Sequence, residues 1–260
     1  MKKTALVTGA CINTGVAIVE RFLNEGYRVV FTGRNQEKVD EALIQYKNKC
    51  EGAEVYGYCI DSLLDDRTVD EKSVVDLFED LDKKGITVDC LVLNAANQGL
   101  GMKIFENPIT DMQKVINTNV VWNYVFVQEC AKRMISAGGG SIVFVNSNTA
   151  YRAIPDRIAY VTSKGAQLGM MRALALDLGK YNVRVNAVLP GMIKTDRWEK
   201  NPDFYKTVPS IYTPIGDVAV GQDIADAVFY FAEYSRNTTG AELTVDGGNT
   251  IQLYPIIPKE

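Results

Sequence analysis

Short apolar runs alternate with amphipathic helical patterns along almost the whole chain, and this alternation limits the fold more than any other feature. Most of the runs are continuous stretches of Val, Ile and Leu, as in strands that are buried on both faces. We therefore predict one α/β domain over residues 1–260, with a doubly wound parallel sheet of about seven strands. The predicted strands are Thr4–Val7, Arg28–Thr32, Val55–Cys59, Asp89–Leu93, Ile142–Val145, Val183–Val188 and Glu242–Val245. The predicted helices are Val16–Asn24, Gln36–Lys49, Lys72–Lys83, Thr110–Ser136, Ile158–Lys180 and Gln222–Glu233.

The segment Met192–Ile215 departs from this pattern. It is longer than an ordinary connection and has no clear period, and such segments are often lids or binding loops. We predict that residues 192–215 form a lid over a substrate of mixed apolar and polar character, larger than a simple sugar. The other predicted walls are Asn97–Leu100 and Asn148–Arg152. The aromatic residues of the predicted lid are Trp198, Phe204, Tyr205 and Tyr212.

The chain contains no histidine, which excludes several kinds of active site. Ser-His-Asp triads, Cys-His dyads and His-ligated zinc are ruled out, and we expect no metal site. Acid–base chemistry near neutral pH therefore needs a tyrosine, lysine, cysteine or carboxylate with a shifted pKa. A net charge of -4 gives no footprint for nucleic acid, and no apolar run reaches the length of a membrane span. The five cysteines form no CxxC pair, so we expect reduced thiols and a cytoplasmic location.

One stretch, Ser147–Lys164, combines side chains that such chemistry needs. Ser147 follows a predicted strand, and ligands of open α/β sheets gather beyond the carboxyl ends of strands. Tyr160 and Lys164 are four residues apart, so they share one face of the following helix. A free phenol has a pKa of about 10, and a nearby ammonium lowers it. We therefore predict that Tyr160 exchanges a proton with a carbinol or carbonyl oxygen, to which Ser147 donates a hydrogen bond.

A turn with two glycines, Thr8–Gly15, joins the first strand to the first helix. Backbone N–H groups and the helix dipole at such a turn favour a pyrophosphate group. The turn reads TGACINTG and lacks the familiar GxGxxG spacing. Taken alone, it leaves a purely structural turn as the alternative to a dinucleotide site.

Six motifs in order and at matching spacing resemble those of the short-chain dehydrogenases/reductases, and the resemblance spans nearly the whole chain. The family's TGxxxGxG is similar to residues 8–15, with Asn13 in place of the middle glycine; asparagine tolerates a left-handed backbone better than other non-glycine residues. Its NNAG motif is similar to Leu93–Ala96, which keeps the second Asn and the Ala. The other four are Asp61 after the third strand, Asn119 in INTNV, Ser147 with Tyr160 and Lys164 in YxxxK, and Pro190, Gly191 and Thr195 in PGxxxT. The DGG of residues 246–248 also fits the family.

The resemblance implies a Rossmann-type fold and an NAD(P)-dependent oxidoreductase that interconverts a ketone or aldehyde and an alcohol. In this family the tyrosine exchanges the proton, the serine orients the oxygen and the lysine contacts the nicotinamide ribose; here these would be Tyr160, Ser147 and Lys164. Asn119 would hold a water in a proton relay toward Lys164. The family commonly forms dimers or tetramers through two long helices, here about 110–136 and 158–180. The implied cofactor contacts are Thr8, Gly9, Asn13, Thr14, Gly15, Asp61, Asn94, Ala95, Tyr160, Lys164, Pro190, Gly191, Ile193 and Thr195.

The end of the second strand predicts NADP(H) rather than NAD(H). NAD-specific members of the family place an aspartate there, whose carboxylate would repel a 2′-phosphate. This chain has Gly33, followed by Arg34, whose planar guanidinium suits phosphate oxygens. Many members also carry a basic residue inside the glycine turn, but Ile12 occupies that place, so Arg34 is expected to act with less help.

Two other functions stay open beside this one. Enoyl-thioester reductases of the same superfamily carry their active tyrosine seven residues before the lysine, where this chain has Arg157, which disfavours that function. A non-catalytic protein that senses NADP(H) usually lacks part of the catalytic set, which is complete here. The substrate is left open between an oxoacyl thioester, a keto sugar or polyol, a steroid or bile acid, and a small ketone.

Overall fold

Seven parallel strands form one sheet in the order β3-β2-β1-β4-β5-β6-β7, which confirms the predicted doubly wound sheet. The structure is a computed structural model that describes residues 2–195, 198, 207–209 and 211–255. The strands are β1 (Thr4–Val7), β2 (Arg28–Gly33), β3 (Val55–Cys59), β4 (Cys90–Leu93), β5 (Gly140–Val145), β6 (Val183–Pro190) and β7 (Glu242–Val245). The helices are α1 (Asn13–Asn24), α2 (Gln36–Lys49), α3 (Glu71–Lys83), α4 (Ile109–Ile116), α5 (Trp122–Ala137), α6 (Ile158–Gly179) and α8 (Gly221–Phe229), with the short turns η1 (Asn117–Val121), η2 (Asn148–Ala150) and η3 (Tyr230–Tyr234).

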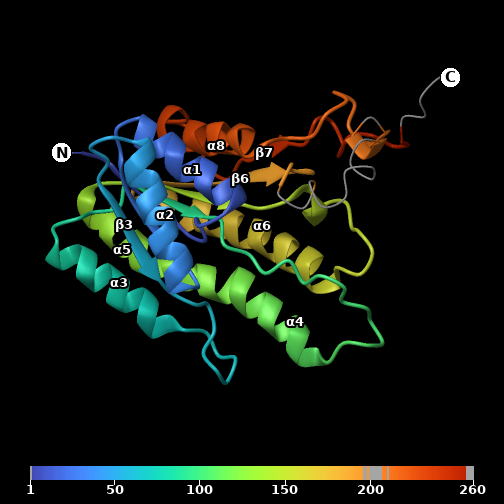
Figure 1. Ribbon diagram of the computed structural model, residues 1–260, viewed down its shortest axis with the longest axis horizontal. Coiled ribbons are helices and arrows are strands. Elements are labelled where there is room, and N and C mark those ends of the chain that lie inside the picture. Colours follow the sequence, from blue (N-terminus) through green and yellow to red (C-terminus); the bar gives the residue numbers. More distant parts are fainter. Residues whose placement is uncertain (1, 196–197, 199–206, 210, 256–260) are drawn as a thin grey trace.

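Helices cover both faces of the sheet, with α1, α2 and α8 on one face and α3, α5 and α6 on the other (Figure 1). Successive residues of a strand point to opposite faces. On β2, Val29 and Phe31 pack with the first group of helices, whereas Val30 packs with the second. This explains why the strands read as continuous apolar runs. Each fully buried Val, Leu or Phe of these layers stabilises the fold by about 1.5–3 kcal/mol.

The helices differ from the predicted ranges in three main ways. The helix predicted over Gln222–Glu233 ends at Phe229 and is followed by the π-helical turn η3. α1 begins at Asn13 rather than Val16, so part of the glycine turn is already helical. The long helix predicted over residues 110–136 is interrupted by η1, a π-helical turn that includes Asn119. Such turns often occur at functional sites, and an apolar pattern with a period of 3.6 does not reveal them. No helix among the described residues is both long and apolar enough to cross a membrane.

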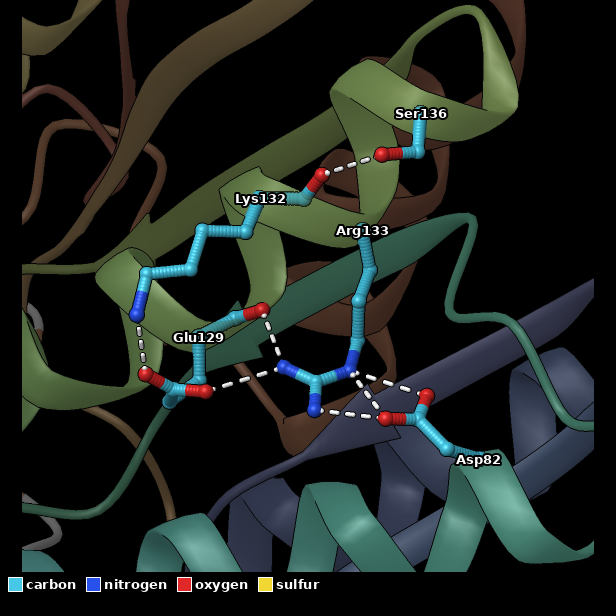
Figure 2. Close-up of polar contacts among 5 residues, drawn as sticks. All are labelled: Asp82, Glu129, Lys132, Arg133 and Ser136. Atoms are coloured by element: carbon cyan, nitrogen blue, oxygen red, sulfur yellow. Dashed lines mark hydrogen bonds and ion pairs between the residues drawn. The ribbon is translucent and has the colours of Figure 1, made fainter.

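Charged side chains fix α5 against α3, as Figure 2 shows. Arg133 on α5 donates to both carboxylate oxygens of Asp82 on α3, with its Nη2 at 2.7 Å from Oδ2. Its Nη1 donates to Glu129 at 2.9 Å, and its guanidinium lies 5.0 Å from the ring centre of Phe78. Because Asp82 is about half exposed, this ion pair stabilises the fold only weakly. It orients the helix that continues from η1.

Candidate active site

The motifs of the sequence lie at one edge of the sheet, where the parallel strands have their carboxyl ends. Ligands of open α/β sheets bind at this edge. β2 ends with Gly33, and β6 with Pro190. The residues that follow the other strands are Thr8 after β1, Asp61 after β3, Asn94 after β4, Ser147 after β5 and Asp246 after β7.

Ser147 and Tyr160 meet at this edge beside a buried lysine. Ser147 precedes η2, and its Oγ accepts from the backbone N–H of Thr149 at 3.2 Å. Tyr160 is in the first turn of α6, and Lys164 lies one turn further on the same helix. The hydroxyl of Ser147 faces the phenol of Tyr160 closely enough to lower its pKa by hydrogen bonding. The predicted convergence of a hydroxyl, a phenol and an amine therefore exists in the structure.

The amine of Lys164 lies in the protein interior, with 1% of the residue exposed. Its Nζ donates to the carbonyl of Val145 at 3.0 Å and to Oε1 of Gln167 at 3.1 Å. It lies 5.5 Å from the ring centre of Tyr160. Because burial disfavours the charged form, it lowers the pKa of Lys164 to about 7.

The phenol of Tyr160 differs from the expectation of a lowered pKa. Burial raises the pKa of Tyr160, and this effect outweighs the opposite effects of the hydrogen bond with Ser147 and of the charge on Arg157. The cation that acts on the phenol is thus Arg157, whose guanidinium lies 5.9 Å from the Tyr160 ring centre. Lys164 is not among the groups that shift the pKa of Tyr160, and burial lowers the pKa of its own amine, which favours the neutral form. Sequence spacing shows which residues share a helix face, but not how deeply each is buried.

Asn119 is fully buried in η1, and its side chain joins three elements. Its Oδ1 accepts from the backbone N–H of Asn97 at 2.7 Å, and its Nδ2 donates to the carbonyl of Asn97 at 2.9 Å and to Oγ of Ser163 at 2.9 Å. The side chain therefore connects the loop after β4 with α6. Its backbone carbonyl accepts from Nδ2 of Asn123 at 2.8 Å and from Nε2 of Gln167 at 2.6 Å.

Two residues of this network, Gln167 and Asn146, are absent from the sequence-based prediction. Asn146 donates from Nδ2 to the carbonyl of Lys164 at 3.0 Å, and its Oδ1 accepts from the backbone N–H of Ser147 at 2.7 Å. A signal for Gln167 is present in the sequence, since it is a polar residue three positions after Lys164 and so lies on the same helix face.

The glycine turn has the left-handed backbone that its sequence predicts. Gly9 has φ 64° and Asn13 has φ 50°, so asparagine takes the conformation proposed for the place of the missing glycine. A Cβ on Gly9 would come within 2.8 Å of Cα of Ala95, and one on Gly15 within 2.6 Å of the Gly9 carbonyl oxygen. Asn94 holds the turn, since its Nδ2 donates to the carbonyls of Thr8 at 3.0 Å and Gly9 at 2.9 Å.

This turn fits the diphosphate of a dinucleotide. The N-terminus of α1 has Ile12 as its N-cap and no side chain that accepts from its first N–H groups. Such unpaired N–H groups at a helix N-terminus bind phosphate oxygens. A cleft of about 380 Å³ opens beside them. It is lined by Asn13, Thr14, Val16, Ala17, Glu20, Lys194, Thr195, Val220, Gly221 and Gln222, and so joins the first turn to the end of the PGxxxT motif.

The end of β2 is crowded on one side and open on the other. A Cβ on Gly33 would overlap the sulfur of Cys11 and come within 2.8 Å of Cγ2 of Val39. Arg34 is exposed and, among the described residues, forms no hydrogen bond or ion pair. Asp61 is also exposed, and its Oδ1 accepts from the backbone N–H of Ser62 at 2.6 Å.

Only part of the predicted lid belongs to the described residues. Phe204 and Tyr205 lie outside them, whereas Ile193, Thr195, Trp198 and Tyr212 lie inside. Ile193 forms a bridge with Ala219 that anchors the start of the segment.

The far end of this segment is held by residues that follow β7. Asn249 donates from Nδ2 to the Tyr212 carbonyl at 2.7 Å, and its Oδ1 accepts from Nδ2 of Asn148 at 2.9 Å. Arg152 donates to the Gln252 carbonyl at 2.7 Å. The residues after β7 therefore join the end of the predicted lid to the predicted wall beside Ser147.

Comparison with known proteins identifies the family. The sequence profile described as short chain dehydrogenase matches residues 3–206. The chain belongs to the short-chain dehydrogenase/reductase family. It is 34% identical over 247 residues to a 3alpha-hydroxysteroid dehydrogenase of Mediterraneibacter gnavus, a match that covers 94% of this chain and 96% of the relative.

Solved structures of family members superpose closely on this chain. The structure of ElxO with NADP bound is 29% identical, with a TM-score of 0.87 over 97% of this chain and 100% of that one. The L-sorbose reductase of Gluconobacter frateurii, complexed with NADPH and L-sorbose, is 26% identical, with a TM-score of 0.87 over 97% and 98% of the two chains. The predicted family and fold are therefore confirmed, and the chain is an oxidoreductase of this family.

Proposed function

We propose that the protein is an NADP(H)-dependent oxidoreductase that interconverts a ketone or aldehyde and a secondary or primary alcohol. The observation that carries this proposal is the contact of Ser147 with Tyr160 beside the buried amine of Lys164, at the carboxyl edge of the sheet. A bound nicotinamide would supply or accept the hydride, so the protein has to position the substrate and move one proton.

In this proposal Tyr160 gives its phenolic proton to the carbonyl oxygen during reduction, or takes a proton from the alcohol during oxidation. Ser147 donates a hydrogen bond to the same oxygen and orients it. Burial raises the pKa of Tyr160, so the phenol is protonated at neutral pH and is ready to act as an acid.

The preference for NADP(H) is supported by the end of β2. Gly33 gives no carboxylate to repel a 2′-phosphate, and the exposed guanidinium of Arg34 has no competing carboxylate among the described residues. ElxO with NADP and the L-sorbose reductase with NADPH are two family members of similar structure that carry this cofactor. Thr8, Gly9, Thr14 and Gly15 would hold the diphosphate, while Asp61 and Asn94 would flank the adenosine and Ile193 and Thr195 would fix the carboxamide.

The substrate is proposed as a carbonyl compound or alcohol with both apolar and polar parts. The relatives named above act on a steroid and on a sugar by their names, so the family does not select between these classes. Trp198 and Tyr212 in the predicted lid support a substrate with apolar surface. An enoyl-thioester reductase is less well supported, because Arg157 stands at the position of that group's tyrosine and covers the ring of Tyr160.

The oligomeric state and the location of the protein are proposed from its exposed apolar side chains and its cysteines. Exposed apolar side chains on α5 and α6, among them Tyr124, Ile158 and Leu176, support a homodimer or homotetramer through these helices. The free cysteines support a reducing cytoplasm.

The test is a screen of ketones, aldehydes and alcohols with NADPH, NADH and their oxidised forms, followed through nicotinamide absorbance. Turnover of at least one carbonyl compound with NADPH, lost in a Tyr160→Phe variant, is the expected result. Tight NADPH binding without turnover of any compound would favour an NADP(H)-sensing protein instead.

A further inference from the structure

Both polar atoms of the Gln167 carboxamide form hydrogen bonds inside the candidate active site. It is 1% exposed and lies one turn after Lys164 on α6. Its Oε1 accepts from Nζ of Lys164 at 3.1 Å and from Nδ2 of Asn146 at 3.1 Å, and its Nε2 donates to the backbone carbonyl of Asn119 at 2.6 Å. The orientation of the amide follows from its partners, since a lysine amine at this position donates and a carbonyl only accepts.

Two side chains donate to the backbone carbonyl of Asn119, Nε2 of Gln167 at 2.6 Å and Nδ2 of Asn123 at 2.8 Å. A carbonyl oxygen has two lone pairs, so these two donors compete with a water for this oxygen. The carbonyl is turned toward these side chains from η1, where the backbone departs from the α-helix.

We propose that Gln167 is a positioning residue that connects Lys164 to Asn119 in place of the water predicted between them. The carboxamide bridge holds the amine of Lys164 between Val145 and the ring of Tyr160. A water relays a proton by accepting one proton and releasing another. An amide could do this only if its C=O and C–N bonds were rearranged. Proton exchange between Tyr160 and solvent therefore does not run through Asn119 in this protein. The catalytic part of this inference rests on the proposed function.

A comparison of Gln167→Leu with Gln167→Ala separates a bridge from a packing role. Leucine fills the space but leaves Lys164 and the Asn119 carbonyl without their partner. Alanine opens a polar space with room for about one or two waters, which can restore both hydrogen bonds. If Gln167 only fills space, leucine is the milder change, because large-to-small changes in a core are costly. If Gln167 is a bridge, alanine is the milder change for the active site.

Two measurements follow these variants. The first is kcat for carbonyl reduction across pH, where we expect the leucine variant to fall at least about tenfold below the alanine variant. The second is the pKa of Lys164, measured by NMR of labelled lysine side chains in the protein without cofactor. Tyr160 is the titratable side chain beside Lys164, and Arg157 lies over the same ring. The two groups that accept from Lys164, the Val145 carbonyl and the Gln167 carboxamide, do not titrate. We expect the pKa of Lys164 to be higher in the alanine variant, where water solvates the amine, than in the leucine variant.

Met171 is the matched control, because it is fully buried one turn further along α6 and belongs to the apolar core. At this position leucine should preserve and alanine should reduce the stability, with no effect on the pKa of Lys164 in either variant. Should the leucine variant at Gln167 fail to fold, Gln167→Met, which is unbranched and also apolar, replaces it.

A failure of the proposed bridge can be distinguished from a failure of the proposed function. Equal pKa values of Lys164 in the leucine and alanine variants, with leucine at least as active as alanine, would overturn the bridge. If the wild-type protein turns over no carbonyl compound, the proposed function fails, and the pKa of Lys164 alone then decides whether Gln167 forms the bridge.

Discussion

The sulfur of Cys11 occupies the space into which a side chain on Gly33 would point. Gly33 ends β2, at the place where NAD-specific members of the family carry an aspartate, and Cys11 belongs to the glycine turn after β1. Two segments that we propose to bind one cofactor are therefore packed against each other. With the thiol of Cys11 in the turn, the end of β2 has room for a glycine but not for a larger residue.

The first prediction concerns this pair. Gly33→Asp alone should destabilise the protein by about 1–3 kcal/mol, because the new side chain overlaps Cys11 and approaches Val39. It should also weaken NADPH binding without creating tight NADH binding. Adding Cys11→Ala should recover most of the stability and shift the preference toward NADH. Thermal unfolding and titration of both cofactors measure these effects.

The single variant Cys11→Ala serves as the control and should keep the preference for NADPH. A Gly33→Asp variant that is as stable as the wild type and already prefers NADH would show that Cys11 does not restrict this position.

The second prediction concerns Arg34. Arg34→Ala should weaken NADPH binding by about ten- to a hundredfold, since a charge-assisted hydrogen bond to phosphate contributes about 1.5–3 kcal/mol. NADH binding should change little, because it has no 2′-phosphate. Lys38→Ala is a suitable control, since Lys38 is a nearby exposed cation that is paired with Glu41 at 2.6 Å. Equal losses for the two cofactors, or for the two variants, would argue against a phosphate contact.

The third prediction concerns Tyr160. Tyr160→Phe removes the proton donor and should lower kcat by about 10²–10⁴-fold, the usual contribution of general acid–base catalysis. Cofactor binding should stay nearly intact, because the ring remains. Tyr181→Phe, an exposed tyrosine just after the end of the same helix, should have no effect. Steady-state kinetics with the best carbonyl substrate, together with NADPH titration, distinguish a chemical loss from a binding loss.

Much of the fold and many of the site residues follow from the sequence, because both depend on local patterns. Five of the seven strands, β1, β2, β3, β6 and β7, begin at the predicted residue, since apolar runs mark buried strands directly. Ser147 and Tyr160 come together because a parallel sheet puts all strand ends at one edge. Asn13 could be placed in a left-handed turn because few other residues accept that conformation.

The remaining features depend on which side chains the folded structure buries and which hydrogen bonds they form. The raised pKa of Tyr160 arises from burial, which no spacing reveals. The fit of Cys11 against Gly33 joins two loops that are distant in the sequence. The bridge through Gln167 requires η1, whose backbone turn exposes the Asn119 carbonyl to α6. Each of these features involves long-range contacts rather than a local pattern.

The last prediction concerns the pH dependence of stability. Burial lowers the pKa of Lys164 to about 7 in the folded protein, whereas an unfolded lysine has a pKa of about 10.4. Between these values the unfolded chain binds a proton that the folded protein does not. The free energy of unfolding therefore rises with pH in this window. Below the window Lys164 is charged in both states, and the full cost of burying its charge opposes folding. Between about pH 7 and pH 9 the contribution of Lys164 should grow by about 2 kcal/mol.

Other groups titrate in the same window with the opposite sign, so a variant is needed to isolate Lys164. Burial raises the pKa of the thiols of Cys11 and Cys130, which makes the folded state lose stability as the pH rises. Lys164→Met keeps the length of the side chain and removes its charge, while these thiols stay the same. Urea unfolding without cofactor at both pH values should therefore show a smaller gain, or a larger loss, for Lys164→Met than for the wild type, by about 2 kcal/mol. Parallel curves for the two proteins would mean that Lys164 stays charged in the folded state up to pH values near those of a free lysine.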